Sequence, residues 1–173
     1  MLKLIVNTYG EDKPGLVSDL SGIIYSLNGN ILESKMVRLE NIFTIIMAIE
    51  IPKKNKSKLE NKIKSIKGLN STIDILNKFD ISKKSTKFIF SLECLDSEGI
   101  INHFTNFFNK QKINIEEMNT TITNAPTTGS FLFNLDSVIT VPENFDLKNL
   151  NTNLDFLSEK YNITYKLLLL KSE

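Results

Sequence analysis

Two hydrophobic spacings follow one another along the first eighty residues. An apolar run at 3–8 is typical of a β-strand. Apolar residues then recur every three or four positions from Leu16 to Leu27, which indicates an amphipathic helix. The same two patterns continue as strands at 31–39 and 43–51, a helix at 59–66 and a last strand that includes 73–76. The first half therefore predicts strand, helix, strand, strand, helix, strand.

The second half repeats the first. Asp12 and Gly15 recur 84 positions later as Asp96 and Gly99, and a fixed offset of this kind indicates a duplicated folding unit. The second copy is expected to contain strands at 88–94, 115–123, 131–141 and 163–170 and helices at 99–109 and 147–160. The resulting prediction is two domains, 1–79 and 86–173, joined by a polar linker at 80–85.

The order βαββαβ is typical of a ferredoxin-like α+β fold, an antiparallel four-stranded sheet with its helices on one face. The run 43–49, FTIIMAI, does not alternate between apolar and polar residues, as a strand with one face in water would. We therefore expect the second face of the sheet to be covered, by the other copy or by another chain.

Composition limits the chemistry available to this chain of 173 residues. A single cysteine, Cys94, excludes an internal disulfide and a zinc site built from cysteines. A Ser-His-Asp or Cys-His centre would need the single histidine, His103, which lies on a predicted helix without a nucleophile motif nearby. We expect no catalytic residues, no metal and no cofactor. No apolar run is long enough to span a membrane and no secretory signal is present, so a cytoplasmic protein is expected.

Charge is unevenly distributed, although the net charge is only +1. Residues 1–84 carry 14 basic and 9 acidic side chains, and residues 85–173 carry 7 and 11. Seven lysines fall within 53–67; they form either a contact for an acidic partner or, more simply, a solvated helix face. The central strand 43–51 lacks the basic and aromatic consensus of an RNA-binding sheet, so no direct binding of nucleic acid is expected.

The junction between the first strand and the first helix, 10–16, has the sequence GEDKPGL. A glycine-containing turn at a helix N-terminus exposes backbone N–H groups, which suit a carboxylate or phosphate. Asp12 either caps the helix or holds an ammonium group, and Pro14 suits a first helical turn. The simpler interpretation is an ordinary capped turn without a ligand.

This junction, followed by an amphipathic helix and NGNI, resembles the ACT domain, an amino-acid-sensing module of metabolic regulators. The second copy has LDSEGII and KINI, with Glu98 where the pattern has proline. The loop NAPTTG at 124–129, followed by FLF, and the tail from Val141 to Ile163 are similar to the tandem ACT proteins of the glycine cleavage system transcriptional repressor family. The resemblance covers nearly the whole chain.

The resemblance implies that ACT domains pair and bind small amino acids at the interface between paired domains. The positions that carry over as ligand-binding are Asp12, Gly15, Leu16, Asn30, Asp96, Gly99, Ile100 and Asn114. The extra negative charge of Glu98 would compete with a bound carboxylate, so the first loop is the better anion site; whether one loop binds or both remains open.

The repressor family has no DNA-binding domain, acts through a LysR-type activator of the glycine cleavage operon and is relieved by glycine. The resemblance therefore implies a glycine-responsive repressor with a protein partner, and a homodimer is a further possibility. The alternative is a regulatory subunit of an amino-acid biosynthetic enzyme.

Overall fold

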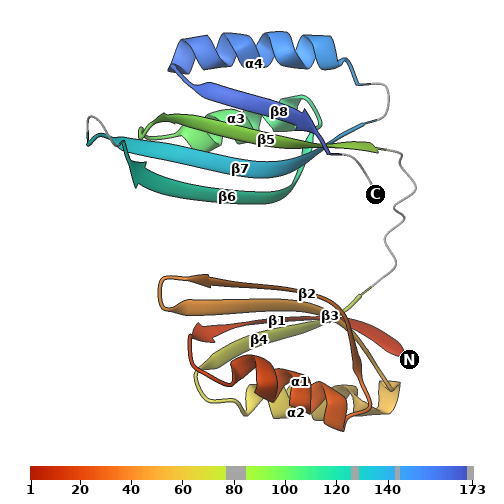
Figure 1. Cartoon of the computed structure of the whole chain (residues 1–173). Coiled ribbons are helices and arrows are strands. Elements are labelled where there is room, and N and C mark those ends of the chain that lie inside the picture. Colours follow the sequence, from red (N-terminus) through yellow and green to blue (C-terminus); the bar gives the residue numbers. More distant parts are fainter. Residues whose placement is uncertain (77–84, 126–128, 143–144, 171–173) are drawn as a thin grey trace. The chain divides into compact units, whose positions relative to one another are not determined.

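The computed structural model of this chain describes residues 1–76, 85–125, 129–142 and 145–170. The chain divides into two compact units, Met1–Phe79 and Asp80–Glu173, which are described separately (Figure 1). Most of the predicted linker, residues 80–84, lies outside the described residues. Its last residue, Ser85, is the first residue of a strand.

The first unit is an antiparallel sheet with the strand order β2-β3-β1-β4, and its helices lie on one face (Figure 1). Its elements are β1 (Leu2–Glu11), α1 (Leu16–Ser26), β2 (Asn30–Leu39), β3 (Ile42–Ile51), η1 (Lys53–Asn55), α2 (Lys56–Lys64) and β4 (Leu69–Ile75). The ferredoxin-like prediction is confirmed. Helix α1 begins at Leu16, so Pro14 precedes the helix and does not occupy its first turn.

The second unit has the same architecture, with the strand order β6-β7-β5-β8. Its elements are β5 (Ser85–Leu95), α3 (Ile100–Lys110), β6 (Asn114–Asn124), β7 (Phe131–Pro142), α4 (Leu147–Tyr161) and β8 (Thr164–Leu169). Both sheets carry a register shift early in their second strand, between Ile31 and Glu33 and between Ile115 and Glu117. The duplication therefore extends to a local irregularity of the sheet.

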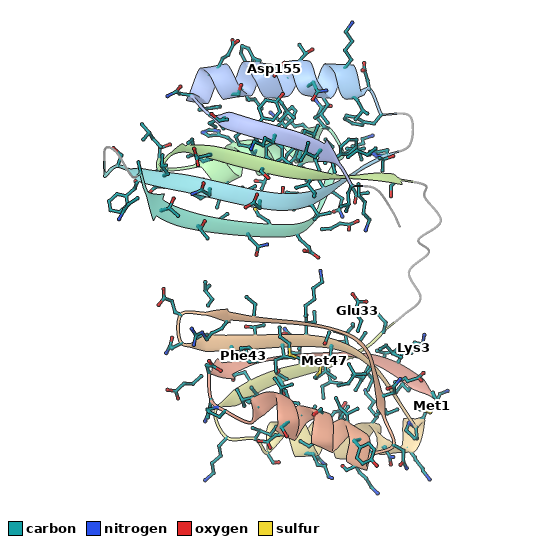
Figure 2. All side chains as sticks on the ribbon, in the orientation of Figure 1. Met1, Lys3, Glu33, Phe43, Met47 and Asp155 are labelled. Atoms are coloured by element: carbon teal, nitrogen blue, oxygen red, sulfur yellow. The ribbon has the colours of Figure 1, made fainter. Side chains whose placement is uncertain are left out.

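Each unit has its own hydrophobic core between the sheet and the helices. In the first unit Leu4 and Val6 of β1 and Met47 of β3 face α1 and α2 and are buried. Figure 2 shows Met47 on the helix side of the sheet and Glu33 on the opposite side. In the second unit Phe90 packs edge-on against Phe108, with ring centroids 5.1 Å apart. No helix among the described residues is long and apolar enough to cross a membrane.

The faces of the two sheets that point away from the helices differ. In the first unit Ile46 and Val37 lie on this face and are 43% and 58% exposed. In the second unit Asp136, paired with Ser91, takes the position that Ile46, paired with Asn7, holds in the first. The apolar face of β3 explains why its sequence does not alternate, and its expected cover stays a prediction.

Alanine substitution is expected to change stability in opposite directions at two glycines of the first unit. A Cβ added to Gly10 would lie 2.2 Å from the Gly68 carbonyl oxygen, whereas one added to Gly22, on α1, would meet nothing within 4 Å. We expect Gly10→Ala to lower the free energy of unfolding by roughly 2 kcal/mol or more through overpacking. Gly22→Ala should raise it by about 0.5–1 kcal/mol through helix propensity. Urea unfolding followed by circular dichroism measures both, and an unchanged Gly10→Ala variant would contradict this packing.

Candidate functional site

A backbone hydrogen bond joins the turn between β1 and α1 to the neighbouring hairpin, and a longer one, from the Leu16 N–H to the Lys13 carbonyl oxygen at 3.5 Å, lies within the turn. The Asp12 N–H donates to the carbonyl oxygen of Asn41, in the β2–β3 hairpin, at 2.8 Å. Gly15 precedes the helix with φ 98° and is its N-cap, and no side chain caps the helix. Within the described residues the amides of Val17 and Ser18 have no acceptor. The helix N-terminus therefore presents open donors.

The turn between β5 and α3 has the same construction. The Asp96 N–H donates to the carbonyl oxygen of Phe131 at 2.9 Å. Gly99 is the N-cap of α3, with φ 85° and again no side-chain cap. Beside it lies a pocket of about 430 Å³, lined by Asp96, Ser97, Gly99, Ile100, Ile101, Asn102, Thr105 and Phe133.

Helix α4 shows what an ordinary cap looks like in this chain. The Asp146 carboxylate accepts a hydrogen bond from the Asn149 N–H at 3.0 Å, which satisfies one of the donors at the N-terminus of the helix. Neither α1 nor α3 has such a bond. The helix-capping role considered for Asp12 is therefore wrong. Helix α2 also lacks a side-chain cap, so the simpler interpretation of the first turn, an ordinary turn without a ligand, stays a prediction.

The two turns differ in charge: acidic and basic side chains balance at the first, whereas the second is acidic. At the first turn the Asp12 carboxylate lies 3.5 Å from Arg38 Nη1. The ammonium of Lys13 donates to the Lys67 carbonyl oxygen at 3.4 Å. The second turn carries Asp96 and Glu98, and its pocket contains no basic side chain. The first turn is consequently the more favourable place for a carboxylate.

Three predicted residues of each copy lie together: Asp12, Gly15 and Leu16, and likewise Asp96, Gly99 and Ile100. Leu16 and Ile100 are only 5% and 6% exposed because their side chains enter the core. They can therefore offer a ligand little besides their backbone.

The fourth residue of each set lies elsewhere in its unit. Asn30, the first residue of β2, pairs with Glu50 of β3, and Glu50 pairs with Lys3 at the beginning of β1. The first turn follows the pair Glu11–Ile42, which lies at the other end of β1. Figure 2 labels Lys3 and Phe43 toward these opposite ends. Eight residues of strand separate the two rows, about 27 Å. The described fold therefore does not bring Asn30 to the first turn.

Asn114 repeats this placement in the second unit. It pairs with Thr140, far along β7 from the Leu95–Leu132 pair beside the second turn. Next to it the Glu116 carboxylate accepts hydrogen bonds from Lys87 Nζ, at 2.6 Å, and from Thr140 Oγ1. Asn114 thus borders a polar cluster that is separate from the second turn.

Sequence reasoning missed the residues that the hairpins contribute. Arg38 near the end of β2, Asn41 in the β2–β3 connection and Phe131 at the start of β7 contact the two turns. The available signal was the predicted fold itself, because β3 and β7 lie beside the strands that end in the turns. A turn at the end of β1 must therefore lie next to the hairpin.

Neither Cys94 nor His103 is part of a reactive cluster. Burial, followed by the charges of Asp96 and Glu93, raises the pKa of the Cys94 thiol, so the thiol stays protonated near neutral pH. His103 is exposed and stacks on Tyr161 with ring centroids 4.5 Å apart. No group of three side chains suited to a metal ion occurs in the part of the chain that the structure describes.

Comparison with known proteins identifies the family. The ACT domain profile matches residues 3–73. A UPF0237 protein of Clostridium perfringens is 30% identical over 81 residues, which cover 47% of this chain and 85% of that protein. This chain belongs to the ACT-domain family. It spans somewhat over half the length of another relative, a UPF0237 protein of Methanococcus maripaludis, which is 30% identical over 53 residues, 31% of this chain and 59% of that protein.

Two solved structures share the tandem fold. An unknown protein of Galdieria sulphuraria has a TM-score of 0.87 at 23% identity, covering 98% of this chain and 99% of that one. A proposed glycine cleavage system transcriptional repressor has a TM-score of 0.71 at 18% identity, covering 99% and 98% of the two chains. At these identities the likeness shows the fold of this ACT protein.

The raised pKa of Cys94 gives a testable expectation for its reactivity. Since alkylation requires the thiolate, we expect iodoacetamide to react at least about tenfold more slowly with the folded chain at pH 8 than with the chain in urea. The folded-state rate should still be rising above pH 9, because the raised pKa delays ionisation. Mass spectrometry measures both rates, and Cys94→Ser supplies the unlabelled control. Equal rates in the folded and unfolded chain would contradict this environment.

Proposed function

We propose that this ACT protein is a regulatory amino-acid sensor and no enzyme, and that glycine is its ligand. The observation that carries the proposal is the repeated turn, in which a left-handed glycine begins an uncapped helix in each copy. Uncapped helix N-termini bind anions through their N–H groups and the helix dipole. An amino-acid carboxylate has the charge and size that such a turn accepts.

The first turn supplies partners for both ends of glycine. Its open amides at Val17 and Ser18 would donate to the carboxylate. The Asp12 carboxylate, which is exposed and paired with Arg38 at 3.5 Å, would exchange part of that pairing for the ligand ammonium. Glycine has almost no apolar surface, so charge-assisted hydrogen bonds at both ends must provide its affinity.

The second turn supports weaker binding of the same ligand. The pocket beside it is lined by the acidic Asp96 and by no basic residue, and Glu98 adds negative charge at the start of the helix. These carboxylates attract an ammonium group and repel a carboxylate. Glycine should therefore occupy the first turn at lower concentrations than the second.

The downstream partner that we propose is a LysR-type activator of a glycine cleavage operon, which this chain would repress until glycine binds. Support comes from the shared fold with the proposed glycine cleavage repressor and from the resemblance of residues 124–129 and 141–163 to the repressor family. Pull-down of the full chain from cells with and without glycine separates the alternatives. A LysR-type activator released by glycine supports the proposal, whereas an amino-acid biosynthetic enzyme would indicate a regulatory subunit.

A matched pair of substitutions at Val17 tests the binding site. Val17 lies in the first turn of α1 and is exposed, so Val17→Asp places a carboxylate among the open amides, and Val17→Asn differs from it only in charge. We expect Val17→Asp to weaken glycine binding at least about tenfold relative to Val17→Asn, through repulsion of like charges. The thermal midpoint of Val17→Asp should equal or exceed that of Val17→Asn, because an acidic residue stabilises a helix N-terminus.

Isothermal titration calorimetry of the full chain with glycine, alanine and serine measures the effect. Ile101→Asp and Ile101→Asn form the equivalent pair at the second turn and should alter only the weaker phase of binding. The absence of heat with every amino acid would remove the sensing function. Equal affinities of Val17→Asp and Val17→Asn would move the ligand away from this turn.

A further inference from the structure

A groove runs between α1 and α2 on the side of the first unit away from its sheet. Its volume is about 460 Å³, and it is lined by Ser18, Asp19, Gly22, Ile23, Ser26, Lys62, Ser65 and Ile66. Of the proposed glycine-binding residues, only Ser18 also lines the groove, and its proposed contact with glycine is made by its backbone amide. The other lining residues lie further along α1 or on the α2 side, so most of the groove is a surface separate from the turn at Gly15.

The α1 side of the groove has little side-chain bulk and little charge. Ser18, Gly22 and Ser26 follow one another at four-residue spacing, which places them in one row along the helix. A Cβ on Gly22 would meet nothing within 4 Å, so open space lies over this row. Nearby on α1, Tyr25 is 82% exposed. An exposed helix face usually carries charged residues, and this one leaves room for a second backbone to approach.

The α2 side is strongly basic. Lys62 Nζ donates to Ser26 Oγ at 3.1 Å, which places its ammonium across the groove, and Lys58 lies one helical turn before it. Lys56 pairs with Glu60 at 3.3 Å. Six other lysines of this segment have no carboxylate within 4 Å among the residues that the structure describes: Lys53, Lys54, Lys58, Lys62, Lys64 and Lys67. Their charge is available to an outside anion.

We propose that this groove docks an acidic amphipathic helix of a protein partner. The lysines would pair with acidic side chains on the flank of that helix, while half-buried Ile23 and Ile66 receive its apolar residues. The isoleucines offer a phosphate backbone no apolar contact, and Asp19, which also lines the groove, disfavours an evenly charged polyanion more than a helix whose acidic residues lie on one flank. A protein segment therefore fits this surface better than a nucleic acid.

The inference rests on the proposed function in one respect, namely that the chain acts by holding a protein. It does not depend on which amino acid binds. Glycine titration of the same variants distinguishes the two proposals, because Lys58, Lys62 and Gly22 lie outside the glycine site. A failure of docking with glycine binding intact would leave the sensor proposal standing.

The test is a selection of displayed 20-residue helical peptides, randomised on their surface positions, against the full chain. Fluorescence anisotropy of the enriched peptides then compares three variants. The double change Lys58→Glu/Lys62→Glu reverses the charge, Gly22→Leu fills the groove without changing charge, and Lys110→Glu/Lys148→Glu is the matched reversal on exposed lysines of the second unit. A 20-base-pair DNA duplex serves as the competing polyanion.

We expect the enriched peptides to carry acidic residues on one flank of an apolar face. Their Kd should rise at least about tenfold with Lys58→Glu/Lys62→Glu and at least about threefold with Gly22→Leu, and remain unchanged with the control pair. No enrichment, or enriched peptides without acidic residues, would overturn the proposal. Unchanged peptide binding by Gly22→Leu would also overturn it, because the attraction would then be non-specific and due to charge alone. A DNA duplex that binds more tightly than every enriched peptide would overturn it as well.

Discussion

In each unit the geometry on which the candidate site depends starts from a backbone hydrogen bond between the turn and the neighbouring hairpin. This bond joins the first residue after an inner strand to the neighbouring hairpin, Asp12 to Asn41 and Asp96 to Phe131. With the end of the strand held there, the chain must reverse quickly into the helix. Gly15 and Gly99 allow this because each has a positive φ, which glycine adopts at no steric cost. A glycine in the N-cap position has no side chain to cap the helix, so its amides stay open.

The two copies share this backbone and differ in the chemistry placed on it. The first turn combines the acidic Glu11 and Asp12 with the basic Lys13 and Arg38, whereas the second carries Asp96 and Glu98 and its pocket has no basic side chain. The sheets differ in the same way, since Asp136 takes the position of Ile46. Duplication thus preserved a helix start suited to an anion, while substitution changed the charge around it. The first copy has the features expected of an anion site and of a protein-binding surface.

The order and type of the elements could be predicted because the hydrophobic spacing of each segment matches its burial. Leu20 and Ile24 lie one turn apart and are both buried, as the helical pattern of α1 requires. What the sequence could not show is the contact between distant segments. The close approach of Gly10 to the Gly68 carbonyl and the pairing of Asp12 with Arg38 both depend on strand register. Register is also the reason why Asn30, a predicted site residue, lies far along the sheet from the first turn.

The central claim is that the open amides at the start of α1 hold the carboxylate of an amino acid. Titration of the ¹⁵N-labelled full chain with glycine, followed by two-dimensional NMR, observes those amides directly. The account predicts saturable shifts that are largest for the amides of Gly15, Val17 and Ser18, with smaller shifts at Ile101 and Asn102 that appear at higher concentrations. Shifts confined to other parts of the chain, or none up to millimolar glycine, would contradict it.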